Sequence, residues 1–122
     1  VLGLTFKPHT DDLRESPMIA LIHELWKDGV DVTASDPGIE LSQMLVANRD
    51  YLERQLPQIE RILRRSFAEA VQGAQAVVVA HRRAEFVEPL AALPSDVAVI
   101  DLVRIASARA PAGLANYRGI AW

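Results

Sequence analysis

The chain has 122 residues, half of them hydrophobic and about a quarter charged, which is the composition of one ordinary globular domain. The formal net charge of −3 excludes the basic footprint of a nucleic-acid-binding or membrane-surface protein, and no apolar run reaches the roughly 20 residues that span a bilayer. The absence of cysteine excludes disulfides, thiolate metal ligands and a cysteine nucleophile within these residues. We expect one domain over residues 1–122 and a cytoplasmic location.

The first expected element is a short strand over residues 1–4, followed by a polar loop and then a helix. The helix start is predicted at Ser16-Pro17, because serine is a favoured N-cap and proline at the first helical position loses no hydrogen bond. Apolar residues at helical spacing continue to Trp26, and Gly29 is the expected residue just past the helix end.

The rest of the chain alternates between expected strands and expected helices. Further strands are predicted at residues 30–34, 63–66, 76–80, 97–100 and 119–122, and helices at two pieces of 39–62 separated by Pro57, at 67–73 and at 84–93. The continuous apolar runs at 76–80 and 97–100 are typical of strands buried on both faces of a parallel sheet. The order predicts an α/β fold, a three-layer sandwich with a mostly parallel, Rossmann-like sheet.

Ligands of an open parallel sheet bind at the carboxyl ends of its strands, so the loops there are the candidate sites. The loop over residues 5–16 is the strongest candidate, because it carries Lys7 and Arg14 and ends at a helix N-terminus. Two cations beside free backbone N–H groups suit an anion such as a phosphate. The alternatives are that Lys7 is an ordinary solvated lysine and that Arg14 forms an ion pair with Asp11 or Asp12.

The other polar loops carry weaker signals. Asp36 stands where dinucleotide-binding folds place a ribose-binding acid, but no Gly-x-Gly-x-x-Gly precedes it, and a simple turn is favoured. The pair Asp11-Asp12 is expected to brace its loop by bonding backbone N–H groups. Arg82-Arg83 is expected to be a solvated pair. The three histidines form no metal-binding motif, and we expect no metal site and no catalytic residue in the chain.

A long motif in the first loop indicates a family. The run Gly-Leu-Thr-Phe-Lys-x-x-Thr-Asp-Asp-Leu-Arg-Glu-Ser-Pro at residues 3–17 resembles the segment that opens the C-terminal domain of the UDP-glucose/GDP-mannose dehydrogenases. Matching features follow in the family's order at Asp36, 47–53, 77–79, 85–86 and 99–103. The resemblance covers essentially the whole chain and is strongest to the branch that oxidises GDP-mannose.

The resemblance implies a nucleotide-sugar-binding domain of an NAD-dependent dehydrogenase that oxidises the C6 alcohol of the sugar, in successive steps, to a carboxylate. By the resemblance, Phe6 and Lys7 contact the nucleotide sugar, and Lys7 lies near its phosphates. Arg14 matches a position that reaches NAD, while Thr10 and the two aspartates of the loop hold its shape. The product would be GDP-mannuronate, a precursor of alginate-type polymers.

The family's other parts have no counterpart in these residues. An N-terminal domain of the family binds NAD, and a central helical region carries a cysteine nucleophile and the dimer contacts. We therefore expect this chain to be part of a longer enzyme, a homodimer or larger, and to be inactive alone. Arg104 stands one place later than a substrate-binding arginine of the UDP-glucose branch, so that role is not assigned to it.

Two alternatives remain open. One is the corresponding domain of a UDP-glucose 6-dehydrogenase. The other is a non-catalytic Rossmann-like module that acts by interaction with other proteins.

Overall fold

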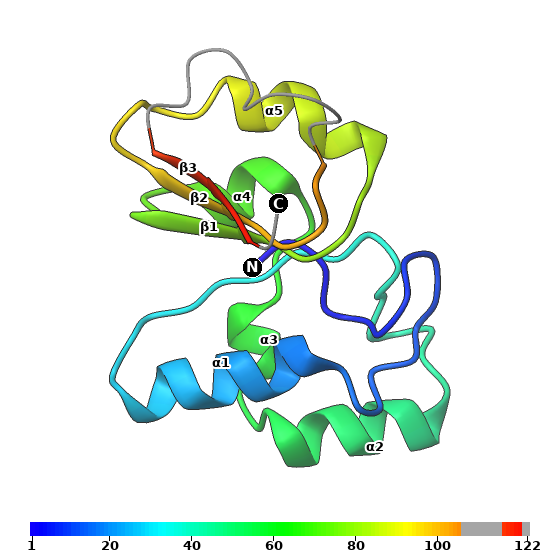
Figure 1. Ribbon diagram of the computed structural model, residues 1–122. Helices are drawn as coiled ribbons and strands as arrows, with labels where there is room; N and C mark the ends of the chain where they lie inside the picture. Colours follow the sequence, from blue (N-terminus) through cyan, green and yellow to red (C-terminus); the bar gives the residue numbers. More distant parts are fainter. Residues whose placement is uncertain (106–115, 121–122) are drawn as a thin grey trace.

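The fold is a parallel sheet between two layers of helices. The computed structural model describes residues 1–105 and 116–120 (Figure 1). In chain order its elements are α1 (Pro17–Lys27), α2 (Val46–Gln55), α3 (Ile59–Ile62), α4 (Phe67–Val71), β1 (Ala76–Val79), the 3-10 helix η1 (Ala84–Phe86), α5 (Val87–Ala91), β2 (Ala98–Asp101) and β3 (Tyr117–Gly119). No helix in the described part of the chain is long and apolar enough to cross a membrane.

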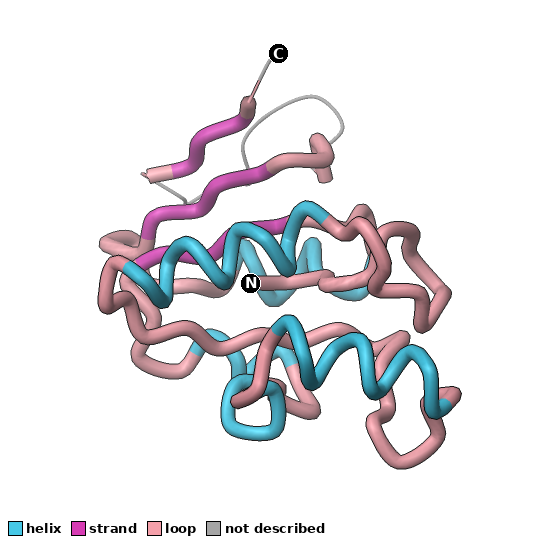
Figure 2. Tube along the Cα trace, turned by 90° about the horizontal axis from the view of Figure 1, so that it is seen from below, coloured by secondary structure: helices cyan, strands magenta, loops and turns pink. Residues whose placement is uncertain are grey.

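The sheet has the strand order of dinucleotide-binding folds. Strands β1, β2 and β3 are parallel neighbours in that order. Figure 2 shows these three strands side by side. Parallel bridges from Leu2 to both Val79 and Ser35, and from Ala34 to Leu63, extend the sheet on the other side of β1. If the six segments are numbered in chain order, their order across the sheet is therefore 3-2-1-4-5-6. The order reverses between the segment at Leu2 and β1, which is the point where such folds bind ligands.

Both faces of the sheet are covered. One buried cluster contains Ile22 of α1, Leu52 of α2 and Ile59 of α3. The other contains Ala70 of α4 and Leu90 of α5, and Figure 1 shows these two groups of helices on opposite sides of the strands. Within β1, Val77 and Val79 belong to the second cluster while Val78 packs against the first. This alternation confirms the predicted three-layer sandwich.

Helix α1 begins where its sequence signals place it. Ser16 has an extended backbone, and its hydroxyl accepts a hydrogen bond from the Met18 amide at 3.3 Å. The same hydroxyl donates to the carbonyl of Leu4, which ties the start of α1 to the end of the first sheet segment. Pro17 is the first helical residue, and Gly29 lies past the C-terminus with a φ of +76°.

Other boundaries differ from the prediction. Helix α2 begins at Val46 rather than near residue 39, and its N-cap, Leu45, makes no side-chain hydrogen bond. Segments 30–34 and 63–66 contribute single bridges instead of full strands. The last strand is Tyr117–Gly119 rather than 119–122, and residues 121–122 lie outside the described part. In each case the local sequence lacks a capping residue or a continuous apolar run to define the boundary.

Candidate functional site

Three polar residues from distant parts of the chain meet where the strand order reverses. Thr5 follows the first sheet segment, Asp36 follows the second, and His81 follows β1. All three are buried, each with only 3 % of its surface exposed. They therefore form the buried floor of the edge at which a Rossmann-like sheet binds its ligands.

The carboxylate of Asp36 joins the first two segments. Its Oδ2 accepts hydrogen bonds from the amides of Leu4 at 2.7 Å and Thr5 at 3.1 Å. The Thr5 hydroxyl oxygen lies 3.2 Å from the same Oδ2, but its one hydrogen is donated to the nearer carbonyl of Lys7. Its Oδ1 accepts from the amide of Gly38 at 2.8 Å, which is an Asx turn. These donors occupy most of the carboxylate's capacity. The interpretation of Asp36 as a turn residue is confirmed, and its link to Thr5 is an addition that the sequence does not reveal.

His81 packs against the backbone of the first segment. Its Nε2 lies 2.8 Å from the carbonyl oxygen of Thr5, and its ring lies over Gly3. Gly3 has a φ of +96°, and a Cβ atom there would be 2.5 Å from Cγ of His81. Glycine is thus required both by the backbone conformation and by the close approach of the imidazole. The only signal of this role in the sequence is a histidine placed directly after a buried apolar strand.

Arg83 is buried, which corrects the expectation of a solvated arginine pair. Its side chain is 6 % exposed, and its Nη1 donates to Oε1 of Glu85 at 2.9 Å. That hydrogen bond holds the pKa of the Glu85 carboxyl below its usual value. The Nη2 atom of Arg83 lies 4.0 Å from Oδ1 of Asp36. Arg82 is exposed, as expected. In an extended segment alternate residues share a face, so His81 and Arg83 both turn inward.

The loop above this floor exposes the two residues expected to contact substrate. Phe6 is 57 % exposed, and Lys7 is exposed as well. The loop backbone is nevertheless fixed, because the Phe6 amide donates to the carbonyl of Asp12 at 3.0 Å. The carbonyl of Lys7 accepts from the hydroxyls of both Thr5 and Thr10 at 2.8 Å. A rigid backbone therefore presents an aromatic ring and a cation to solvent.

Arg14 forms the ion pair that is the alternative to a ligand contact. Its Nε and Nη2 donate to the two carboxylate oxygens of Asp12 at 2.9 and 3.0 Å. Asp12 also accepts from the backbone amide of Arg14 at 3.1 Å, so it braces the loop as predicted. The hydrogen bond from the Arg14 side chain is the main cause of a lowered pKa at Asp12. Both side chains are well exposed, so the pair is weak and open to exchange.

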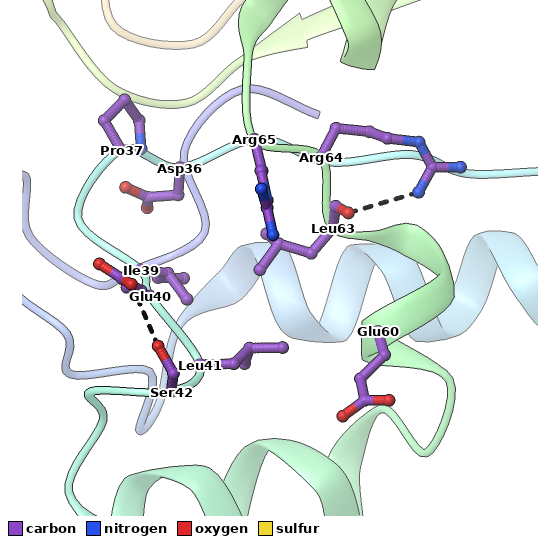
Figure 3. A pocket seen from close by; sticks show the side chains of 10 residues that line it. All are labelled: Asp36, Pro37, Ile39, Glu40, Leu41, Ser42, Glu60, Leu63, Arg64 and Arg65. Carbon is purple, nitrogen blue, oxygen red and sulfur yellow. Dashed lines mark hydrogen bonds between the residues drawn. The ribbon is translucent and has the colours of Figure 1, made fainter.

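A cleft of about 690 Å³ lies beside this site, at the ends of the second and third sheet segments (Figure 3). Its lining residues are Asp36, Pro37, Ile39, Glu40, Leu41, Ser42, Glu60, Leu63, Arg64 and Arg65. Figure 3 shows Glu40 and Glu60 on opposite sides of the cleft, with Arg65 between them. The charges in this cleft are mixed. Among the described residues, no group of three or more His, Cys, Asp or Glu is placed to hold a metal ion.

Known proteins are similar to this chain in sequence and in fold. The family model described as "UDP-glucose/GDP-mannose dehydrogenase family, UDP binding domain" matches residues 1–108. The chain belongs to this family. The GDP-mannose 6-dehydrogenase of Pseudomonas syringae pv. syringae is 34 % identical over 100 % of this chain and 28 % of its own length. The UDP-glucose 6-dehydrogenase of Rhizobium meliloti is 51 % identical over 51 residues, which are 41 % of this chain and 12 % of that protein.

A solved structure supports the same assignment. The ternary complex of GDP-mannose dehydrogenase from Pseudomonas aeruginosa aligns with a TM-score of 0.81 and 31 % identity, covering 99 % of this chain and 27 % of that chain. The predicted family and the Rossmann-like fold are thus confirmed. The chain spans about a quarter of the length of these dehydrogenases.

Proposed function

We propose that this chain is the nucleotide-sugar-binding domain of an NAD-dependent GDP-mannose 6-dehydrogenase. The observation that carries the proposal is the fixed loop exposing Phe6 and Lys7 at the ligand-binding edge of the sheet. The match over the whole of this chain to a protein named GDP-mannose 6-dehydrogenase supports the choice of nucleotide sugar. The intact enzyme would convert GDP-mannose to GDP-mannuronate by successive oxidations at C6, for use in alginate-type polymers.

Each side chain of the loop has a physical role in this proposal. Lys7 is a compact point charge that pairs with the phosphates of the nucleotide sugar. The exposed ring of Phe6 offers an apolar face for a planar or sugar ring of the same ligand. Thr5 and Thr10 hold the carbonyl of Lys7, so the loop does not have to order when the ligand binds. The chain binds and orients substrate but supplies no catalytic residue.

Arg14 is proposed to contact NAD, which takes up hydride from the sugar alcohol. The residues here do not form a complete NAD site, since no Gly-x-Gly-x-x-Gly turn is present. A guanidinium already in bidentate contact with the Asp12 carboxylate is suited to bind a phosphate oxygen pair instead. The rest of the NAD site, the catalytic cysteine and the subunit contacts of a homodimer or larger assembly would lie in other domains of a cytoplasmic enzyme.

A second candidate is the same domain of a UDP-glucose 6-dehydrogenase. It is favoured by the 51 % identity to the Rhizobium meliloti protein, although that match spans only 51 residues. Calorimetric titration of the chain with GDP-mannose and with UDP-glucose separates the two functions. Tighter binding of GDP-mannose supports the first, and tighter binding of UDP-glucose supports the second.

The role of Lys7 is tested by comparing Lys7→Ala with Lys27→Ala, since Lys27 is exposed on α1 and away from the loop. Loss of a charge-assisted contact is worth about 1.5–3 kcal/mol, so Lys7→Ala should weaken GDP-mannose binding roughly 10- to 100-fold. The melting temperature of both variants should stay close to that of the parent, and Lys27→Ala should bind normally. An unchanged affinity in Lys7→Ala removes Lys7 from the site.

A further inference from the structure

Two buried nitrogen atoms beside Asp36 have no hydrogen-bond partner. They are Nδ1 of His81 and Nε of Arg83, the two such side-chain atoms among the described residues. Buried polar groups in native proteins are almost always paired, so an unpaired one calls for a physical reason. The carboxylate of Asp36 lies close to Nδ1, with Oδ2 at 3.6 Å.

The contacts of His81 define which nitrogen carries a proton. A carbonyl oxygen only accepts, so Nε2, at 2.8 Å from the carbonyl oxygen of Thr5, must be the donor. In the neutral ring Nδ1 then presents a lone pair to the Asp36 carboxylate, and two acceptors face each other. A second proton on Nδ1 turns this contact into an ion pair, and a closure of a few tenths of an ångström makes it a hydrogen bond.

The charged groups around His81 do not balance one another. Asp36, whose side chain is fully buried, lies near Arg83, and Arg83 is paired with the partly exposed Glu85. The charge of His9, in the first loop, contributes a little to the lowered pKa of the Glu85 carboxyl. Asp36, Arg83 and Glu85 together carry one net negative charge. An imidazolium at His81 neutralises that cluster, and buried charges are tolerated only when compensated in this way.

We propose that His81 is a positioning residue for nucleotide-sugar binding, and that its second proton locks the loop that carries Phe6 and Lys7. The inference rests on the function proposed above. The connection runs through Thr5, whose carbonyl accepts from His81, whose amide donates to Asp36 and whose hydroxyl donates to the carbonyl of Lys7. Thr5 is 3 % exposed, while the next residue, Phe6, is 57 % exposed. Fixing the position of Thr5 therefore fixes the direction in which the side chains of Phe6 and Lys7 project into solvent.

The sign of the pH effect follows from the contact. The hydrogen bond to Asp36 exists while His81 holds both protons, so its contribution is present at low pH and is lost as the ring deprotonates. Affinity for the nucleotide sugar should fall in the same interval. Since one charge-assisted hydrogen bond is lost, a decrease of roughly tenfold is expected, equivalent to about 1.4 kcal/mol.

The experiment combines a direct readout of the ring with a binding profile. Ring-nitrogen NMR of the chain between about pH 5 and pH 8 reports the protonation state of His81. Calorimetry with GDP-mannose over the same interval gives the affinity. We expect an imidazolium at His81 at the low end, and an affinity that falls as its signal becomes that of the neutral Nε2–H ring. A ring that is neutral throughout the interval overturns the proposal.

Matched variants separate positioning from folding. His81→Gln keeps an N–H near the carbonyl of Thr5 but does not titrate, so its GDP-mannose affinity should be nearly independent of pH. His9→Gln and His23→Gln replace exposed histidines and should retain the parent profile. Lys7→Ala should weaken binding at every pH with the slope preserved. An unchanged pH profile in His81→Gln overturns the proposal.

The experiment distinguishes two kinds of failure: that protonated His81 does not fix the loop, and that the chain does not bind a nucleotide sugar. If GDP-mannose and UDP-glucose bind at no pH, the proposed function fails, and the ring-nitrogen signal still reports His81. Without ligand, backbone amide shifts of Thr5, Phe6 and Lys7 that follow the titration of His81 would then support the proposal that its second proton fixes the loop. Amide shifts that are constant through that titration would contradict it.

Discussion

Gly3 allows a direct test of how the first segment packs against the turn after β1. We expect Gly3→Ala to destabilise the fold through two separate effects. A φ of +96° strains any residue with a Cβ atom, at a cost on the order of 1–3 kcal/mol. The new methyl group would also lie 2.5 Å from Cγ of His81, far inside ordinary contact distance. Overpacking of a buried ring adds about 1–3 kcal/mol.

The two effects sum to about 2–6 kcal/mol, out of the roughly 5–15 kcal/mol that is typical of a whole domain. Gly29→Ala is the matched control, because Gly29 has a φ of +76° but no atom within 4 Å of the place its new methyl group would take, so it bears only the backbone strain. His81→Ala removes the ring that the Gly3→Ala methyl would meet. In that background Gly3→Ala should cost only about 1–3 kcal/mol, from backbone strain alone.

Urea unfolding of the parent chain, Gly3→Ala, His81→Ala, the double variant and Gly29→Ala gives the five free energies of unfolding, provided that the urea dependence stays constant. The coupling between Gly3 and His81 should be about 1–3 kcal/mol. If Gly3→Ala is no more destabilising than Gly29→Ala, or costs the same with and without the His81 ring, then the imidazole does not pack closely over Gly3.

Three further predictions concern other contacts. Asp36→Ala leaves buried N–H groups unpaired and should lower the free energy of unfolding by about 3–5 kcal/mol in urea titrations, and a loss under about 1 kcal/mol would contradict its linking role. Burial, and then a hydrogen bond to Asp101, raise the pKa of Tyr117, so its phenol should ionise above the usual range and its stabilising bond should persist at neutral pH and disappear in strong alkali. The check is to compare spectrophotometric titrations of the parent chain and of Tyr117→Phe. If the parent shows one additional tyrosine that ionises in the ordinary range, this prediction is refuted. Arg14→Ala should return the pKa of Asp12 toward its ordinary value, by carboxyl NMR, with little change in melting temperature because the pair is exposed. A large drop in melting temperature would show that the pair supports the fold.

The elements are most predictable where their signals are local. Ser16-Pro17 and Gly29 mark the two ends of helix α1, because capping depends on residues within one turn of the helix end. Strands β1 and β2 follow from continuous apolar runs. The start of α2 is predicted too early, since Leu45 is not a capping residue and offers no local marker of the boundary.

The exposed candidate residues can be picked out from the sequence, and the buried residues beneath them cannot. Lys7 and Arg14 stand out by their place between a strand and a helix. The inward roles of Asp36, His81 and Arg83 depend on contacts across 31 to 76 residues of sequence, such as that from His81 to Thr5. Only the folded sheet brings these segments to one edge, so residue type and spacing alone do not separate a buried arginine from its solvated neighbour.

Nucleotide-sugar binding by the first loop is tested most directly by backbone amide NMR of the chain during titration with GDP-mannose and, separately, UDP-glucose. We expect shifts centred on Phe6, Lys7 and Thr10, with GDP-mannose bound more tightly. Shifts centred instead on the cleft over residues 37–42 and 60–65, or no shifts with either nucleotide sugar up to millimolar concentration, would contradict the proposed site.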